Sequence, residues 1–230
     1  MELLIAGLIL IALYSIPVIL RYISYRRTNY FKVTHKPYFG RDVGSVGEYN
    51  LYRKLQFLEK QSGRFLFNLY IPKANGETTE IDIVLLHPKG IFVFESKNYK
   101  GWIFGNSNNR YWTQVLPKGK GKKSNKERIY NPIRQNASHI KHLSKLLDLT
   151  IPMQSMVVFS DEATFKELTI EPSTCDVVYL AQVRGVIKRH LKQAKIDALT
   201  SKEIDETYHQ LYPFTQVDQE VVKRHNSRAH

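Results

Sequence analysis

The longest hydrophobic run of the chain lies at its start. From Leu3 to Leu20, eighteen consecutive residues have no charged side chain. A helix of that length spans about 27 Å, which nearly matches the roughly 30 Å hydrocarbon core of a membrane. The chain opens on Glu2 rather than on a basic residue, which argues against a cleaved signal peptide. We therefore predict a transmembrane anchor at residues 1–20.

Shorter apolar runs and apolar residues at helical spacing fill the chain from residue 44 to residue 215. Short runs between turn signals predict strands, and apolar side chains three or four positions apart predict helices. The predicted strands lie at 64–71, 81–86, 91–94, 102–104, 110–115, 153–159 and 176–180. The predicted helices lie at 46–60, 131–149, 181–195 and 201–212. This alternation indicates an α/β sandwich with a mixed sheet, followed by a frayed tail at residues 216–230.

Two predicted strands are apolar on both faces and yet contain charged residues. They flank the turn at His87–Gly90. Strands buried on both sides lie in the middle of a sheet, where a charged side chain needs a partner. Asp82 lies in the first strand, and Glu95 and Lys97 project from one face of the second, about 7 Å apart. A hairpin would bring all three together, and the simpler alternative is an ordinary cross-strand Glu–Lys pair.

Clustered carboxylates repel one another unless a cation neutralises them. Mg²⁺ is usually held by one or two carboxylates, with water and substrate phosphate completing its coordination. Asp82 and Glu95 suit such an ion, and Lys97 is then placed to orient or deprotonate water or to stabilise charge on the phosphate. Glu48 lies three residues before Leu51 on the apolar face of its helix. The simple explanation for that carboxylate is a favourable interaction with the helix dipole.

Two basic stretches carry most of the formal net charge of +13. The first has no acidic residue and consists of Arg21, Arg26, Arg27, Lys32, Lys36 and Arg41. The second, in a predicted mobile loop at 117–128, consists of Lys118, Lys120, Lys122, Lys123, Lys126 and Arg128, with Glu127. We predict that this loop binds the phosphates of nucleic acid, and the alternative is a solvated loop that keeps the protein soluble.

The first basic stretch follows the predicted membrane span. Arginines in that position hold their side in the cytoplasm, so we predict a single-pass protein with its N-terminus outside. We interpret residues 21–43 as a basic juxtamembrane linker from Arg21 to Arg41 that contacts anionic lipid headgroups, with nucleic acid as the competing partner. The single Cys175 excludes an internal disulfide framework, and 43% hydrophobic residues suffice for one globular domain.

Four sequence blocks resemble the nuclease-related domain family, NERD, which is similar to the PD-(D/E)xK restriction-endonuclease-like superfamily. The blocks are Gly47-Glu48, Ile81-Asp82, Gly90-Ile91-Phe92-Val93 with Glu95-Ser96-Lys97-Asn98-Tyr99 and Gly101, and Asn131-Pro132 with Gln135-Asn136. The resemblance covers residues 44–150 and implies an α-β-β-β-α-β core, which residues 151–215 complete. It also implies that Glu48, Asp82 and Glu95 are metal ligands, that Lys97 is catalytic, and that Gln135 lines the site.

The resulting prediction is a membrane-anchored, cytoplasm-facing nuclease that hydrolyses phosphodiester bonds of DNA or RNA, with DNA favoured. Its cofactor would be Mg²⁺, with Mn²⁺ as a substitute. The alternative is a non-catalytic module of the same fold that tethers nucleic acid or binds protein.

Overall fold

A five-stranded mixed sheet forms the centre of the computed structural model, which describes all residues except 41, 118–123, 148–150, 172–174 and 229–230. Its strand order is β1-β2-β3-β7-β9. The strands are β1 (Arg64–Pro72), β2 (Thr78–His87), β3 (Gly90–Lys97), β7 (Met153–Phe159) and β9 (Asp176–Tyr179). The first three pair antiparallel, whereas β7 pairs parallel with both β3 and β9. The predicted mixed sheet is therefore confirmed.

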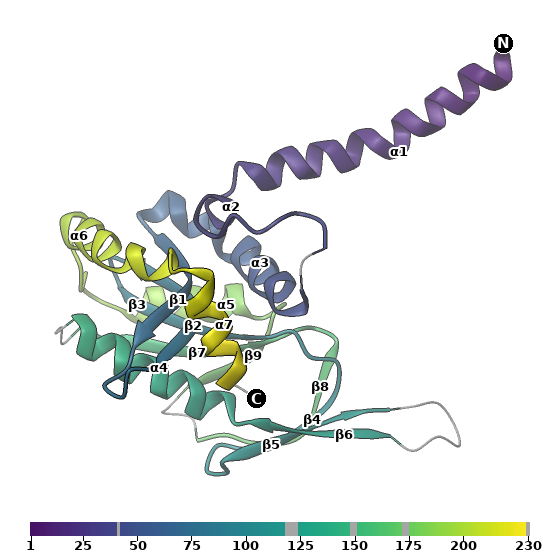
Figure 1. The fold of residues 1–230 in the computed structure, drawn as a ribbon. Helices are drawn as coiled ribbons and strands as arrows, with labels where there is room; N and C mark the ends of the chain where they lie inside the picture. Colours follow the sequence, from purple (N-terminus) through teal and green to yellow (C-terminus); the bar gives the residue numbers. More distant parts are fainter. Residues whose placement is uncertain (41, 118–123, 148–150, 172–174, 229–230) are drawn as a thin grey trace.

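Helices cover both faces of this sheet, which explains why its strands are apolar on both sides (Figure 1). On one face, α3 (Val43–Leu55) and α5 (Val183–Gln193) pack against Phe92 and Phe94 of β3. On the other, α4 (Pro132–Leu147) and α6 (Ser201–Leu211) pack against Ile91 and Val93. The order α3-β1-β2-β3-α4-β7 confirms the predicted fold class.

A second sheet contains three strands that lie between β3 and α4 in the chain and a fourth that follows β7. It has the order β6-β5-β4-β8 and consists of β4 (Gly101–Asn106), β5 (Tyr111–Leu116), β6 (Asn125–Tyr130) and β8 (Ala163–Thr169). The prediction of a loop at 117–128 is wrong for its last residues, because Asn125–Tyr130 form strand β6. Strand β8 was not predicted. Both are mostly exposed strands at the edges of this sheet, held by backbone pairing with β5 and β4, so they carry no clear apolar alternation.

The predicted loop cations divide into two groups. Lys126 and Arg128 lie on β6, where the Arg128 guanidinium lies 3.9 Å from the centre of the Tyr111 ring. Lys118, Lys120, Lys122 and Lys123 lie outside the described residues.

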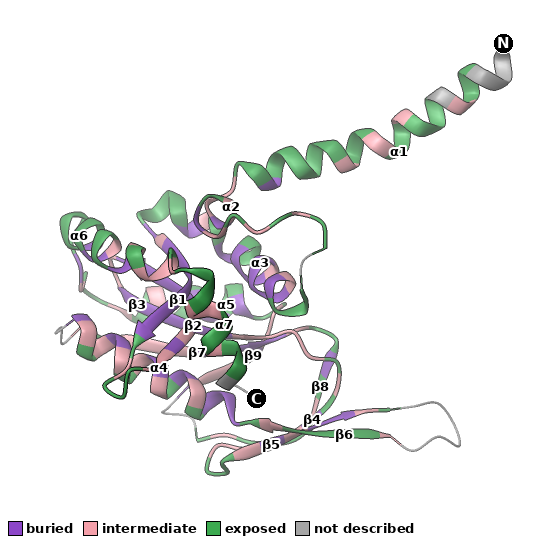
Figure 2. Cartoon of the chain, in the orientation of Figure 1, coloured by how far each residue is buried: buried purple, intermediate pink, exposed green. Residues whose placement is uncertain are grey.

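The first helix, α1 (Glu2–Arg26), projects away from the rest of the molecule (Figure 1). It is apolar and long enough to cross a membrane between Ile5 and Arg26, and most of its described surface is exposed (Figure 2). Its last turn is different, because the Tyr25 side chain is fully buried. That ring packs on Tyr30 of α2 (Asn29–Thr34) and on Tyr49 of α3.

The predicted juxtamembrane linker is therefore largely folded. Tyr25, Tyr30 and Val33 all belong to the hydrophobic core beneath α3. The spacing of the tyrosines in this basic sequence did not indicate a helix. Only the packing against α3 shows that they are core residues. Lys36, one of the predicted lipid-binding cations, instead pairs with Glu48 at 3.3 Å.

Two further boundaries differ from the prediction. The helix predicted at 46–60 begins at Val43, because the Asp42 side chain accepts a hydrogen bond from the Ser45 backbone N–H at 2.9 Å. Its last part, Gln56–Gln61, is a 3₁₀ helix.

The predicted frayed tail contains α7 (Gln219–Arg228), which follows a short 3₁₀ turn at Tyr212–Thr215 and docks on β2. A tertiary contact made by a polar helix leaves little trace in the hydrophobic pattern.

Candidate active site

The β2–β3 hairpin brings the predicted acidic residues together. Ile83 pairs with Phe94, so the next position of the antiparallel register places Asp82 opposite Glu95. The Ser96 backbone N–H donates a hydrogen bond to Asp82 Oδ2 at 2.7 Å. Asp82 is thus held at the edge of the buried hairpin, where its other carboxylate oxygen has no hydrogen bond among the described residues.

Glu95 and Lys97 follow Val93 on the face of β3 that α4 covers. Glu95 is 1% exposed, and its Oε1 accepts a 2.6 Å ion-pair hydrogen bond from Lys97 Nζ. The same ammonium donates to Gln135 Oε1 at 3.1 Å. The structure therefore brings Lys97, Glu95 and the predicted Gln135 into one contact network.

His139 belongs to this network and was missed from the sequence. Its Nε2 lies 3.0 Å from Glu95 Oε2, and its Nδ1 lies 2.7 Å from Thr79 Oγ1. The ring is 3% exposed. The only available signal was spacing, because His139 is four residues after Gln135 and hence on the same face of α4. A histidine beside an apolar stripe does not indicate a role in an active site until its carboxylate partner is known.

Glu48 lies near this network but has other direct partners. It is 7% exposed, and its Oε2 accepts hydrogen bonds from the Tyr30 hydroxyl at 3.1 Å and from Lys36 Nζ at 3.3 Å. Its charge is close enough to raise the pKa of Asp82. The structure thus places Glu48 within electrostatic range of Asp82, and no hydrogen bond among the described residues joins it to Asp82 or Glu95.

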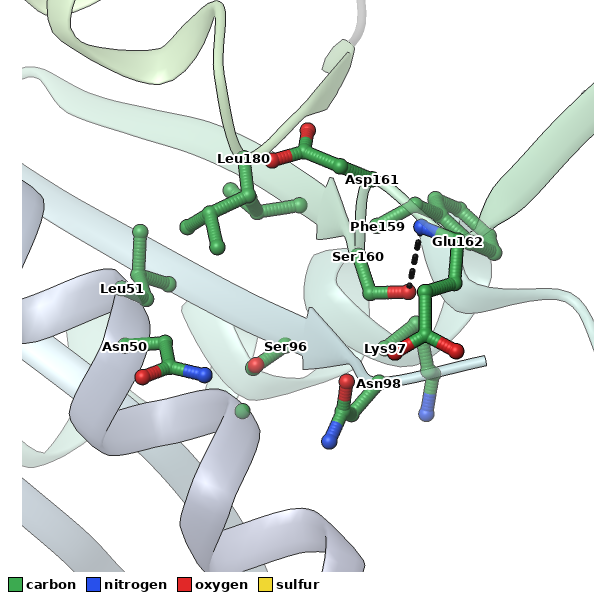
Figure 3. A pocket seen from close by; sticks show the side chains of 12 residues that line it. Asn50, Leu51, Ser96, Lys97, Asn98, Phe159, Ser160, Asp161, Glu162 and Leu180 are labelled. Carbon is green, nitrogen blue, oxygen red and sulfur yellow. Dashed lines mark hydrogen bonds between the residues drawn. The ribbon is translucent and has the colours of Figure 1, made fainter. Parts of the chain in front are cut away.

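A close approach of α3 to β3 positions Glu48. A Cβ on Gly47 would lie 2.8 Å from Asn98 Cβ and 3.1 Å from Ser96 Oγ, so only glycine allows this packing. Asn98 Nδ2 also donates to the Val43 carbonyl at 2.8 Å. Figure 3 shows Ser96 and Asn98 beside α3, around a small hollow of about 170 Å³. The Gly47-Glu48 block is therefore explained by helix–strand packing.

The carboxylates differ in their preferred protonation state. Burial raises the pKa of Asp82 well above its ordinary value, and the nearby Glu95 and Glu48 charges raise it further. Burial also acts to raise the pKa of Glu95, but Lys97 and His139 outweigh it and lower that pKa. Burial acts to lower the pKa of Lys97, and the Glu95 carboxylate reverses this and raises it. The Glu95–Lys97 pair is thus ionic, whereas at Asp82 burial and the Glu95 and Glu48 charges outweigh Lys97 and the Ser96 hydrogen bond, which act to lower its pKa.

The oxygen donors at this site suit a hard cation. On β1, the pairs Phe67–Ile83 and Leu69–Ile81 place Asn68 opposite Asp82, and the Asn68 backbone has a φ of +50°. Its buried Oδ1 has no hydrogen-bond partner among the described residues. A strained asparagine with an unpaired oxygen beside a repelled carboxylate fits Mg²⁺ or Mn²⁺ chemistry. Within the described part of the chain, no three His, Cys, Asp or Glu side chains are already arranged around one ion position.

A cavity of about 710 Å³ opens beside these groups. Asp82, Gln135 and His139 line it, together with Glu80 two residues before Asp82 on β2. Its volume lies within the range of ordinary ligand pockets. The Asp82 side of the network therefore faces a cavity large enough to hold a ligand.

Comparison with known proteins matches residues 43–160 to the nuclease-related domain, which is slightly more than half of the chain. The chain belongs to the nuclease-related domain family. That family lies within the restriction-endonuclease-like superfamily, so the resemblance noted in the sequence is confirmed. The matched part of the nuclease-related domain begins at the first residue of α3 and ends just beyond β7. It includes Glu48, Asp82, Glu95, Lys97 and Gln135.

An uncharacterized protein of Bacillus anthracis is 30% identical over 187 residues, covering 81% of this chain and 84% of that protein. This similarity reaches beyond the nuclease-related domain itself. No solved structure matches the chain significantly.

Proposed function

We propose that the protein is a metal-dependent nuclease that hydrolyses phosphodiester bonds, with DNA as the favoured substrate. The observation that carries this proposal is the pairing of Asp82 opposite Glu95, with Lys97 on the same network, beside a cavity. Membership of the nuclease-related domain family supports a nuclease-like role. Cleavage of DNA by the full chain in Mg²⁺, absent in excess chelator and in an Asp82→Asn variant, tests it.

Each residue of the network has a role in this proposal. Asp82 would hold Mg²⁺ with Glu95 and with Glu48 as the third acid, and the ion when bound would supply Lewis-acid stabilisation of the phosphoryl oxygens. Lys97 is a cation at neutral pH because its pKa is raised, so it stabilises negative charge and orients water rather than removing a proton. Gln135 and His139 position Lys97 and Glu95 through their contacts at 3.1 Å and 3.0 Å.

A non-catalytic module that tethers nucleic acid or binds protein is the second candidate. One observation favours it: both oxygens of Glu95 are already paired, Oε1 with Lys97 and Oε2 with His139. Binding a metal through Glu95 requires one of these partners to move. A chain that binds DNA with unchanged affinity in Mg²⁺ and in chelator, and never cuts it, would support this candidate.

We propose that the basic loop grips the phosphates of the nucleic acid. Replacing Lys118, Lys120, Lys122 and Lys123 with Gln is expected to flatten the slope of log affinity against log salt by roughly 2 to 3, because each lost phosphate contact removes about 0.7 to 0.9 and we expect most of the four lysines to contact phosphate. The measurement is a salt titration with labelled DNA, using Ca²⁺ in place of Mg²⁺. The control removes four exposed lysines elsewhere, Lys54, Lys60, Lys192 and Lys195. Equal slopes in the two variants would identify the loop as merely solvated.

We also propose that α1 anchors the protein in a membrane, with the N-terminus outside, the domain in the cytoplasm, and remaining cations such as Arg21 and Arg27 near anionic lipid. The burial of Tyr25 makes the last turn of this helix part of the core, which supports a helix that is continuous with the domain.

Protease added outside intact cells is expected to spare the folded domain, because the arginines after the span keep it in the cytoplasm. Immunoblotting of a C-terminal tag measures this, and permeabilised cells provide the control in which the domain becomes accessible. Digestion in intact cells would reverse the proposed orientation.

A further inference from the structure

The C-terminal helix α7 forms part of the cavity beside Asp82. Arg224, His225 and Asn226 line the same cavity as Asp82 and Gln135. Helix α7 starts at residue 219, far beyond the matched residues 43–160, so the family core does not include it. A segment outside the nuclease-related domain therefore contributes a wall of the candidate active site.

His225 docks this helix on the first residues of β2. Its Nδ1 donates to the Thr78 carbonyl at 3.2 Å and lies 3.2 Å from Thr78 Oγ1. Its Nε2 lies 3.8 Å from Glu80 Oε2, and its ring packs edge-on against Tyr70 at 5.6 Å. Thr78 and Glu80 alternate with Asp82 along the strand, so the contact places α7 next to the acidic end of the cavity.

Two walls of the cavity carry opposite charge, because strand β2 supplies Glu80 and Asp82 whereas α7 supplies Arg224. Lys73 also lines the cavity, but it pairs with Glu77 at 3.6 Å. Among the described residues, no carboxylate lies within 4 Å of the Arg224 guanidinium, and its side chain is exposed. An unpaired guanidinium on the wall of a cavity suits a planar, bidentate contact with a phosphate group.

We propose that Arg224 is a substrate-binding residue that contacts a backbone phosphate of the nucleic acid next to the bond being cut. This inference rests on the proposed nuclease function and adds to it a contact from outside the family domain. Helix α7 thereby forms the phosphate-binding wall of the cavity, and His225 is the positioning residue that holds it there. The opposite arrangement, in which α7 keeps nucleic acid out of the cavity, predicts effects of the opposite sign.

The test compares Arg224→Gln with Lys223→Gln in the full chain in detergent. The two substitutions remove the same charge from adjacent exposed positions of α7, but Lys223 does not line the cavity. Arg224→Gln is expected to weaken binding of fluorescent DNA about tenfold in Ca²⁺, because a charge-assisted hydrogen bond to phosphate is lost. It should also lower the salt slope by about 0.7 to 0.9. Lys223→Gln should change the affinity by less than about twofold.

Cleavage in Mg²⁺ gives a second readout. A lost ground-state contact raises KM and leaves kcat nearly unchanged, and His225→Ala, which undocks the helix, should shift KM in the same direction. Equal affinities for the Arg224 and Lys223 variants, in a protein whose cutting still depends on Asp82, would overturn the Arg224 proposal alone. Tighter binding or faster cutting by the Arg224 or His225 variant would overturn the Arg224 proposal and would support the alternative in which α7 keeps nucleic acid out of the cavity. Absence of any DNA binding by the unaltered chain would overturn it together with the proposed function.

Discussion

Asp82→Asn is expected to lower the rate of DNA cleavage by about 1000-fold or more while leaving the protein folded. A metal ligand supplies several kcal/mol of charge stabilisation in the transition state, and about 4 kcal/mol corresponds to a factor of about 1000. The amide keeps the shape of the carboxylate but loses the charge that attracts Mg²⁺. The measurement is single-turnover cleavage in Mg²⁺ by the full chain, with Asp205→Asn, a remote surface variant paired with Arg64, as the control.

The same substitution has a definite effect on stability. The pKa of Asp82 is raised in the folded state, so the unfolded chain loses this proton first as pH increases. Stability therefore falls from the ordinary carboxyl pKa upwards, until the folded carboxyl is itself ionised. Asp82→Asn removes this cost, so the variant should lose less stability than the unaltered chain as the pH rises above the ordinary carboxyl pKa.

Metal binding should also stabilise the folded chain through Asp82. Mg²⁺ at ten times its Kd should add about 1.4 kcal/mol to the free energy of unfolding of the unaltered chain, and Asp82→Asn should abolish the gain. Full cleavage activity in the Asn variant, or an equal stabilisation of both proteins by Mg²⁺, would remove Asp82 from the site.

Lys97→Met is expected to abolish cleavage and to lower the free energy of unfolding by about 3 kcal/mol. Glu95 is 1% exposed, and removing its ammonium partner leaves a buried carboxylate with only His139 to compensate it. The double variant Glu95→Gln/Lys97→Met removes both charges and should recover most of the lost stability without recovering activity. Thermal and urea unfolding of the full chain in detergent measure these differences.

The stability that Glu95 contributes depends on pH. The pKa of Glu95 is lowered in the folded state, so its contribution is present above the ordinary carboxyl pKa and is lost as pH falls through the folded value. The double variant should lack this acid-dependent loss. A Lys97→Met protein as stable as the unaltered chain would show that the ion pair contributes no net stability, and retained cleavage would exclude Lys97 from the chemistry.

The central sheet was predictable because burial on both faces imposes continuous apolar runs. Phe92 and Phe94 face α3 while Ile91 and Val93 face α4, so β3 could be recognised without knowing either helix. Asp82 and Glu95 stood out for the same reason, since a charged residue in such a strand needs a partner. The second sheet was harder to predict, because β6 is an exposed edge strand held by backbone pairing.

The missed residues of the candidate site depend on tertiary contacts between distant segments. His139 acquires its role only when α4 lies beside Glu95, 44 residues earlier in the chain. His225 contacts Thr78 across 147 residues, and no local pattern encodes that separation. Tyr25 was assigned to a linker because its neighbours are basic, whereas the packing of its ring on Tyr49 decides its place.

The buried Tyr25 also determines how freely the domain can move relative to α1. A flexible tether would let the domain sample a large volume and rotate freely. Here the final turn of α1 is built into the hydrophobic core through Tyr25, Tyr30 and Tyr49, so the helix and the domain share one rigid junction. In the proposed membrane-anchored arrangement, this junction fixes the height and orientation of the cavity beside Asp82 relative to the lipid, so the proposed nucleic-acid substrate has to reach that height.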